Sequence, residues 1–381
     1  MGTWTRPKRH AYTLSEYERL ALGGRVNLSD GHARTPLSRR QREIVGATLP
    51  MLDTALSRSQ KSIEDEFLRC FFQCGGQHVD SDDLNTFLTF SSSSAIKIAA
   101  QYCRINGLSV CLLEPCFDNI VHILRTEGVP ILPVREEELH EVDLLATRLT
   151  STTALWLVQP NNPTGFCLEP EEFKRLITAV ADRGTTIVLD FCFRMYADTL
   201  GRWNQYSELN AAGVTFICIE DTGKTWSLAD TKVGITVCSA AAASLIYRLH
   251  DELLLNVSPL HLLLLTEFIK DTLTVGICKA VREGVERNRE VVHALVQDGV
   301  LRHAAPACHN VPMELLGLQD GTLATLFWRS LRDRGIDVLP AENYFWSRPL
   351  EGRTLFRVPL SRPFEDIDAA VPAIRQTLIA I

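Results

Sequence analysis

Short runs of β-branched and other apolar residues alternate with helical patterns along most of the chain. Such runs, bounded by turn residues, predict strands at 86–90, 110–113, 129–134, 154–158, 186–189, 215–219 and 235–238. Helical patterns lie between them, for example at 119–127 and 170–183, and the second begins with acids and ends at Gly184, as helix termini prefer. This alternation is typical of a mostly parallel sheet covered by helices.

The pattern changes in the C-terminal third. A long helical pattern runs from 259 to about 297, and after it come a helix at 323–334, strands at 337–339 and 354–358, and a helix at 364–379. We therefore expect a polar N-terminal arm (1–45), a large domain (46–295) and a smaller α+β C-terminal domain (296–381). The sequence shows no repeats or flexible linkers, so we expect the parts to pack tightly.

Composition narrows the class of ligand. The 46% hydrophobic content of the 381 residues supports a substantial buried core, and the net charge of -7 provides no broad basic field for nucleic acid or an anionic membrane. A small molecule is the better expectation. The most apolar stretch, 253–269, contains polar residues such as Asn256 and Glu267, so a buried helix pair broken at Pro259 explains it better than a membrane span.

Cysteine usage and the N-terminus favour the cytoplasm. The 11 cysteines are scattered, and Cys70 and Cys74 lack a second pair at zinc-ligand spacing, so we interpret the cysteines as reduced packing residues and expect no metal. The segment 1–12 is polar and basic with no apolar segment behind it. Arg6 stands where a myristoylation signal has Ser or Thr. We expect a soluble cytoplasmic protein.

Four polar motifs follow predicted strands, at the edge where open α/β sheets bind ligands. The first, Ser91–Ser94, opens a helix whose N–H groups and hydroxyls suit a phosphate, although a Ser run taken alone is usually just an N-cap and turn. The second is Asn-Asn-Pro-Thr-Gly at 161–165. It is either an ordinary turn or a loop that fixes an Asn side chain against a ring oxygen.

The third and fourth motifs place an acid and an amine at the ends of predicted strands. Asp190 closes the buried strand 186–189, where a carboxylate needs a cationic partner. A protonated pyridine nitrogen is such a partner, and the alternatives are an N-cap or a buried salt bridge. Lys224 ends the motif Glu-Asp-Thr-Gly-Lys at 220–224, and Lys232 follows it. Lys224 is either a solvated surface residue or an amine that condenses with a coenzyme aldehyde.

Together these motifs resemble those of the fold-type I, aspartate-aminotransferase-like superfamily of pyridoxal 5′-phosphate (PLP) enzymes. The resemblance implies an α/β fold with PLP held as a Schiff base on Lys224, Asp190 at the pyridinium nitrogen and Asn162 at the 3′-oxygen. It also implies ring stacking by Phe117, phosphate contacts from Ser92, Ser93 and Lys232, and substrate-carboxylate binding by Arg357.

Two positions depart from ordinary aminotransferases. Phe193 stands where the superfamily usually has Tyr, and Asp221 replaces a Ser that contacts the phosphate. An acid beside a phosphate is repulsive unless it serves a cation. These departures favour a basic substrate or a neighbouring lysine as the partner of Asp221.

The chain is also similar to a narrower family, the dioxygen- and PLP-dependent L-arginine hydroxylases and oxidases. The similarity rests on 30–34 (Asp-Gly-His-Ala-Arg), 117–120, 220–224 and 360–362. It implies an arm folded over the active site, with these roles: guanidinium binding by Glu18 (or Glu16), Asp30 and Asp221, a substrate contact from Ser15, and a late catalytic role for His32. Paired carboxylates suit a guanidinium and histidine moves protons near neutral pH, although a solvated loop also explains 30–34.

We therefore expect oxidation of L-arginine by dioxygen, without flavin or metal, in a specialised-metabolite (antibiotic) pathway. The resemblance implies that Lys224 removes the α-proton and that the product is a 4-hydroxy-2-oxo acid or a dehydro or 2-oxo compound. The alternative is an aminotransferase for a basic amino acid, and a third reading is a PLP-binding module without turnover. The resemblance and the apolar 253–269 region predict a homodimer.

Overall fold

The structure is a computed structural model that describes residues 12–77, 85–304 and 309–380. The expectations about N-terminal signals concern residues 1–11, which lie outside this range. Among the described helices, none is long and apolar enough to cross a membrane.

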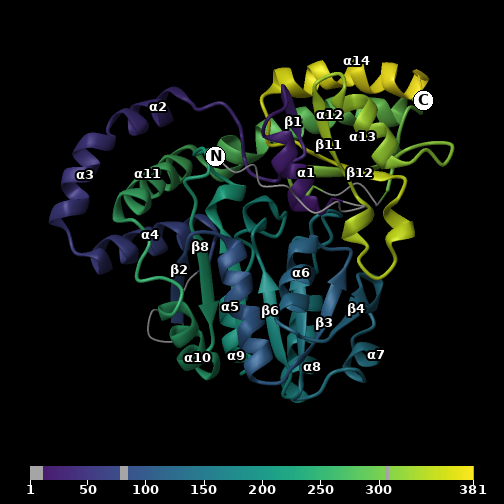
Figure 1. The fold of residues 1–381 in the computed structure, drawn as a ribbon. Coiled ribbons are helices and arrows are strands. Elements are labelled where there is room, and N and C mark those ends of the chain that lie inside the picture. The colour runs from purple at the N-terminus through teal and green to yellow at the C-terminus, as the bar shows by residue number, and fades with distance from the viewer. Residues whose placement is uncertain (1–11, 78–84, 305–308, 381) are drawn as a thin grey trace, which may run out of the picture.

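A seven-stranded sheet forms the centre of the larger part of the molecule (Figure 1). Its order is β2-β8-β7-β6-β5-β3-β4. The strands are β2 (Asn85–Thr89), β3 (Ser109–Glu114), β4 (Ile131–Arg135), β5 (Thr153–Val158), β6 (Thr186–Asp190), β7 (Phe216–Asp221) and β8 (Gly234–Cys238). All seven predicted strands are present, and only β8 runs antiparallel to its neighbours, β7 and β2. Since β2 is antiparallel to β8 and β8 is antiparallel to β7, β2 runs in the same direction as β7. Its C-terminal end therefore lies at the same sheet edge as those of β5, β6 and β7.

Helices cover this sheet and complete the core. They are α4 (Gln60–Cys74), α5 (Ser92–Ile105), α6 (Asp118–Thr126), α7 (Val142–Ala146), α8 (Pro170–Asp182), α9 (Gln205–Ala211), α10 (Ala240–Asp251) and α11 (Pro259–Val275). The central strand β5 is buried along its whole length, as expected for a parallel strand covered on both faces. The mostly parallel α/β fold predicted from the sequence is confirmed.

The C-terminal part contains a mixed five-stranded sheet of order β1-β11-β12-β10-β9. The strands are β1 (Val26–Leu28), β9 (Arg302–His303), β10 (Met313–Gly317), β11 (Ile336–Pro340) and β12 (Leu355–Pro359), and the helices are α12 (Glu283–Gln297), α13 (Ala324–Arg332) and α14 (Phe364–Ala380). The sequence predicted β11, β12, α13 and α14, but it did not predict β9, β10 or β1.

The single helical pattern predicted for 259–297 is two helices, which corrects that prediction. α11 ends at Val275, and the next residue, Gly276, has a φ of 92° that is incompatible with a helix. A short π-helical turn, Cys278–Arg282, then leads into α12.

The N-terminal arm lies partly against the small sheet. Its first helix, α1 (Leu14–Ala21), starts at a capping box between Thr13 and Glu16. β1 then pairs in parallel with β11. By contrast, α2 (Arg39–Gly46) and α3 (Thr48–Ser57) lie at one side of the molecule, against α11 (Figure 1).

Candidate active site

A cavity of about 230 Å³ lies where the arm, the edge of the large sheet and the small sheet meet. Nearly all residues predicted for the site line it: Ser15, Glu18, His32, Ser92, Ser93, Phe117, Asn162, Asp190, Asp221, Lys224, Lys232 and Arg357. Phe193, singled out as a departure, lines it too. Asp30 does not. The residues of the four strand-end motifs thus converge as the strand-end argument predicted, and the arm and Arg357 meet them there.

Asp190 is a buried acid facing this cavity from the end of β6. Its Oδ1 accepts a hydrogen bond from the backbone N–H of Cys192 at 3.0 Å, and within the described residues it forms no ion pair. Burial raises the pKa of Asp190, although the Cys192 hydrogen bonds and the charge of Lys224 oppose this. A buried carboxylate without an ion-pair partner is suited to a protonated ring nitrogen, so the site fits PLP at this point.

Lys224 ends a short 3₁₀ turn directly after β7. Burial lowers the pKa of its ammonium group, but the charges of Asp221 and Glu18 outweigh burial, and the net pKa is raised. The same attraction, together with hydrogen bonds from Ser92, keeps the pKa of Asp221 low despite burial. Lys224 is therefore a partly buried amine whose positive charge is stabilised by nearby acids.

The phosphate turn contains an unexpected contact. Asp221 Oδ2 accepts from the backbone N–H of Ser92 at 3.0 Å and from its hydroxyl at 2.7 Å, at the N-terminus of α5. Its Oδ1 caps the N–H of Gly223 at 2.8 Å. The Ser92 groups predicted for a phosphate thus bond to Asp221 in this structure. Ser93 and Lys232 also line the cavity.

Arg357, on β12, is fully buried and held from two sides. Nη1 donates to Asn162 Oδ1 at 3.2 Å and to the Tyr344 hydroxyl at 2.7 Å. Nη2 donates to Glu18 Oε1 at 3.0 Å and to the backbone oxygen of Ser29. Tyr344 was not predicted, because it lies in a segment between β11 and β12 with no periodic pattern.

The structure separates Glu18 from Glu16, a choice that the sequence left open. Glu18 lines the cavity, and its Oε1 also accepts from the backbone N–H of Gly31 at 3.2 Å. Glu16 instead receives the backbone N–H of Thr13 at 2.9 Å in the capping box of α1. Of the two acids, Glu18 is the one that faces the site.

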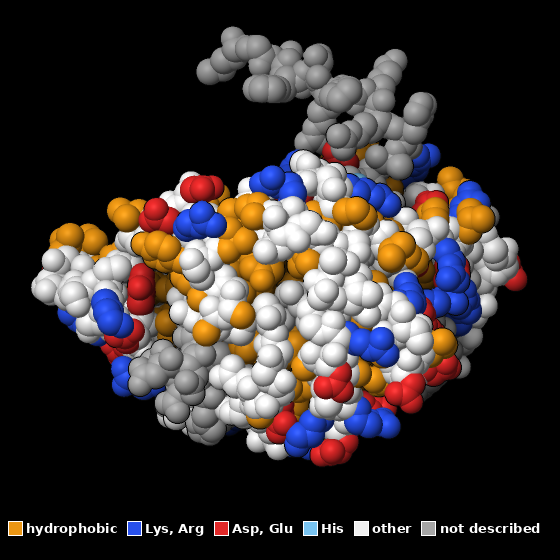
Figure 2. All heavy atoms as spheres, turned by 90° about the horizontal axis from the view of Figure 1, so that it is seen from below, with side chains coloured by type: hydrophobic (Ala, Val, Ile, Leu, Met, Phe, Trp, Pro, Cys, Tyr) orange, Lys and Arg blue, Asp and Glu red, His pale blue; other side chains and the backbone are white. Residues whose placement is uncertain are grey.

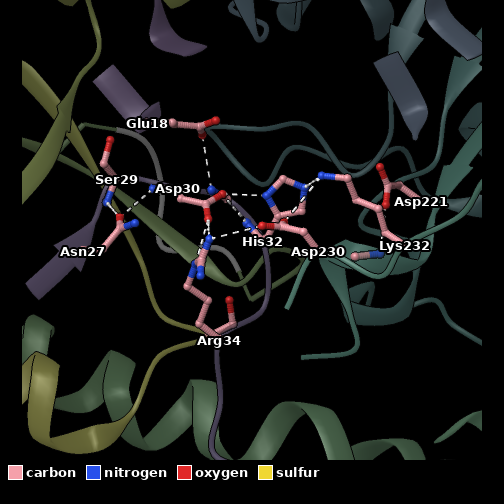
Figure 3. Close-up of polar contacts among 12 residues, drawn as sticks. Glu18, Asn27, Ser29, Asp30, His32, Arg34, Asp221, Asp230 and Lys232 are labelled. Atoms are coloured by element: carbon pink, nitrogen blue, oxygen red, sulfur yellow. Dashed lines mark hydrogen bonds and ion pairs between the residues drawn. The ribbon is translucent and has the colours of Figure 1, made fainter. Parts of the chain in front are cut away.

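Asp30 faces His32 and Arg34 instead of the cavity (Figure 3). Its Oδ1 lies 2.6 Å from His32 Nδ1, and its Oδ2 accepts from Arg34 Nε at 2.8 Å. On the far side of the ring, His32 Nε2 lies 2.8 Å from Lys232 Nζ. Asp230 lies 3.6 Å from Lys232 and 3.8 Å from Arg34, which closes a ring of polar and charged side chains.

Arg362 holds the backbone that carries His32. Its Nε and Nη1 donate to the carbonyls of Asn27 and His32, both at 2.7 Å, and Nη2 donates to that of Asp30. Burial lowers the pKa of Arg362 to about 10. Arg362 belongs to the motif at 360–362, but no role for its side chain was predicted from the sequence.

A second residue that the sequence did not reveal is Glu136, directly after β4. Its Oε1 accepts from Asn161 Nδ2 at 2.6 Å and from the Thr164 hydroxyl, so it fixes the loop that presents Asn162. Burial raises its pKa to about 7, although both hydrogen bonds oppose this. Residues 136–138 are three consecutive glutamates, and nothing in the sequence distinguishes Glu136 from the other two.

A group of metal-type side chains lies elsewhere, in the small sheet. Single ligand atoms of His293, His303 and Glu314 lie within 4.8 Å of one another. Glu314, however, already pairs with the buried Arg289. Because that cation satisfies Glu314, the geometry gives no reason to place a metal there.

These features can be compared with known proteins. A model of the family "Aminotransferase class I and II" matches residues 53–374. The chain belongs to this family. It is a fold-type I, PLP-dependent enzyme of the aminotransferase class.

The chain is also similar to curated proteins. It is 26% identical over 147 residues to a histidinol-phosphate aminotransferase of Thermococcus kodakarensis (38% of this chain, 40% of the relative). It is 28% identical over 158 residues to an aromatic amino acid aminotransferase of Rhodococcus opacus (40% and 42%). The matched segments thus span about two fifths of these curated relatives.

Two solved structures cover nearly the whole chain. MppP soaked with the product 2-ketoarginine has a TM-score of 0.85 and 31% identity, covering 93% of this chain and 99% of MppP. Aspartate aminotransferase from Thermus thermophilus with maleate has a TM-score of 0.78 and 14% identity, covering 96% and 97%, so this likeness shows the fold alone.

Proposed function

We propose that this chain oxidises L-arginine with dioxygen. In the two-electron branch, arginine, dioxygen and water give 2-ketoarginine, ammonia and hydrogen peroxide. In the four-electron branch, arginine with two molecules each of dioxygen and water gives 4-hydroxy-2-ketoarginine, ammonia and two molecules of peroxide. A specialised-metabolite pathway is the context that we propose for either product.

One observation carries the proposal: the arm places the carboxylate of Glu18 in the same cavity as Lys224 and Arg357. Asp221 adds a second acid to that cavity. An amino acid held near Lys224 would therefore have acids within reach of a cationic side chain, as guanidinium binding requires. The likeness to MppP, whose structure contains the product 2-ketoarginine, supports the same substrate.

The residues present fit PLP. Lys224 would hold it covalently, Asp190 would pair with its ring nitrogen, and Asn162 would contact its 3′-oxygen. The ring would stack on Phe117, and the phosphate would bind Ser93 and Lys232, with Ser92 joining them if Asp221 turns away. When bound, PLP supplies the electron sink that stabilises a carbanion at the substrate Cα.

The chain's own groups would then orient the substrate and move its protons. Arg357 would bind the substrate carboxylate and Glu18 the guanidinium, with Ser15 at the rim. Lys224, once its amine is free, would remove the α-proton of the substrate through Nζ. His32 would act later, on the water that adds at Cγ or on reduced oxygen, because it lines the same cavity as Lys224 and histidine side chains can transfer protons near neutral pH.

Asp30 takes a different role in this proposal from the one that the sequence suggested. Both of its carboxylate oxygens are engaged by His32 and Arg34, and it does not line the cavity. We therefore assign it to orienting His32 rather than to binding guanidinium. Glu18 and Asp221 are left as the guanidinium partners.

The competing function is an aminotransferase, because the curated relatives carry that activity. The purified holoenzyme should consume dioxygen when L-arginine is added without any 2-oxo acid, and release ammonia and peroxide. If instead arginine is consumed under nitrogen only when a 2-oxo acid is supplied, and that acid becomes aminated, the chain is an aminotransferase.

We also propose that the enzyme is a homodimer. α3 buries none of its residues in the described chain, and Leu49 and Leu56 are 72% and 79% exposed. Figure 2 shows apolar side chains on the projection where α3 lies. The 253–269 region contributes less than predicted, because Leu262, Leu265 and Phe268 are buried within the chain itself.

A further inference from the structure

Glu18 is the one anionic side chain that pairs with Arg357 among the described residues. Arg357 is fully buried, and its other side-chain partners, Asn162 and Tyr344, are neutral: burial raises the pKa of the Tyr344 hydroxyl far above its usual range. A buried guanidinium without an anion is costly. Glu18 therefore neutralises the arginine of the proposed carboxylate site when no substrate is present.

The incoming α-carboxylate would need the place that Glu18 Oε1 holds. Nη2 of Arg357 donates to Glu18 and to the Ser29 carbonyl, Nη1 is already taken by Asn162 and Tyr344, and Nε alone has no hydrogen-bond partner within the described residues. A carboxylate that binds Nε in the planar fork would take its second N–H from the neighbouring Nη2, which Glu18 occupies. Two carboxylates at one buried guanidinium repel each other. Binding of an amino acid thus displaces Glu18, and the displaced carboxylate needs a new cation in the same cavity.

We infer that Glu18 determines specificity by exchange. The Glu18–Arg357 ion pair breaks readily only when the incoming amino acid has a cationic side chain, because that cation replaces Arg357 as the partner of Glu18. Arginine meets this condition, whereas a neutral amino acid of the same shape must break the Glu18–Arg357 pair without replacement. The inference rests on the proposed function, because it takes Arg357 as the carboxylate site and arginine as the substrate.

The exchange is tested with two ligands that lack the α-amine and so cannot react with the coenzyme. 5-Guanidinopentanoate carries both charged ends of arginine, and 5-ureidopentanoate is its neutral isostere. Calorimetric titration of the holoenzyme should show the guanidino ligand binding about tenfold or more tightly than the ureido ligand, as a charge-assisted pair predicts.

The decisive variant is Glu18→Gln, whose amide oxygen can still accept from Arg357 but carries no charge. It should bind the guanidino ligand about tenfold more weakly and the ureido ligand about tenfold more tightly, because Arg357 no longer has an anion to lose. Glu16→Gln makes the same change on the same helix at a capping position, and it should alter neither affinity.

Different failures have different meanings. If Glu18→Gln weakens guanidino binding but leaves ureido binding unchanged, Glu18 is only a guanidinium ligand and the exchange is wrong. If the parent enzyme binds both ligands equally, the arginine assignment fails, and the specificity role fails with it. If Glu18→Gln does not retain the coenzyme, Glu18→Asp, which keeps the charge but shortens its reach, should still tighten ureido binding, and no tightening would overturn the exchange.

Discussion

Asp30 Oδ1 lies 2.6 Å from His32 Nδ1, while Lys232 Nζ lies 2.8 Å from Nε2 of the same ring. A protonated lysine can only donate, so Nε2 accepts and Nδ1 carries the proton that bonds to Asp30. Although burial favours the neutral acid, the hydrogen bonds from His32 and the charge of Arg362 outweigh it, and the pKa of Asp30 lies well below its usual range. An ionised Asp30 therefore fixes the tautomer and orientation of His32.

Asp30→Asn should impair the step that uses His32 without changing how arginine binds. An amide can donate to the ring and favour the wrong tautomer, so formation of hydroxylated product should fall about a hundredfold, the scale of a lost acid–base catalyst. Product rates and calorimetric affinities measure the two effects separately. In a His32→Ala background, adding Asp30→Asn should cost little more. A large further loss of arginine affinity there would restore the guanidinium role of Asp30.

His32→Ala should change the product ratio more than the consumption of dioxygen. Lys224 performs the first proton transfer in the proposed mechanism, so arginine should still be oxidised while the share of hydroxylated relative to unhydroxylated oxo acid falls. Mass spectrometry of the products, alongside an oxygen electrode, measures both. If every step slows equally and the ratio is unchanged, His32 only fastens the arm. A parent enzyme that makes no hydroxylated product would exclude the hydration role.

Lys224→Ala should abolish turnover and the absorption band of lysine-bound coenzyme. Among the residues that line the cavity, the other lysine is Lys232, and it bonds to His32 rather than lying beside Asp190. Absorbance spectra and oxygen uptake check the result. Lys232→Ala is a useful comparison, because it should weaken coenzyme retention while keeping the band. A Lys224 variant that retains the band and multiple turnovers would disprove the assignment.

Glu136 should make the protein less stable as the pH rises. Its pKa is raised from an ordinary value of 4.5 to about 7, so the folded state holds a proton that the unfolded state releases. The resulting stabilisation is complete below about pH 4.5 and is lost as the pH rises to about 7, in total up to about 3 kcal/mol. Glu136→Gln should flatten this dependence. Thermal unfolding at about pH 5 and about pH 8 tests it, and parallel pH profiles for both proteins would contradict it.

Charges on α3 should weaken self-association. Leu49→Glu combined with Leu56→Glu places two carboxylates in the exposed apolar face, so the mass in solution should shift from dimer toward monomer. Light scattering across a dilution series measures this. Leu350→Glu changes a leucine that is 71% exposed outside α3 and is the matched control. A parent protein that is monomeric and fully active would reject the dimer.

The sequence predicted the large sheet better than the small one for a physical reason. Strands such as β5 are buried on both faces and therefore form continuous apolar runs, whereas β1 and β9 have only three and two residues, too few to show a period. Gly276 was not recognised as a break, because a glycine is tolerated within a helical pattern until its φ is known.

The position of the candidate site could be predicted because several of its residues lie at the ends of strands that the sequence reveals. The directions of its side chains could not be predicted. Asp190 and Lys224 follow parallel strands, whose ends meet at one edge. The orientation of Asp30 depends on contacts that no local pattern encodes, namely its bonds to His32 and Arg34 and the hold of Arg362 on the backbone. Tyr344 was missed because it lies between strands in an irregular segment.

The pairing of β1 with β11 affects how the arm can be studied. β11 bonds to β12 along one side and to β1, at Val26–Leu28, along the other. Deleting the arm would therefore leave the N–H and C=O groups on one side of β11 without partners, and an unpaired sheet edge is a template for joining another chain. A truncated protein would tend to aggregate through this edge, and its lost activity would say little about Glu18 or His32. Point substitutions that keep β1 in place are the informative experiments.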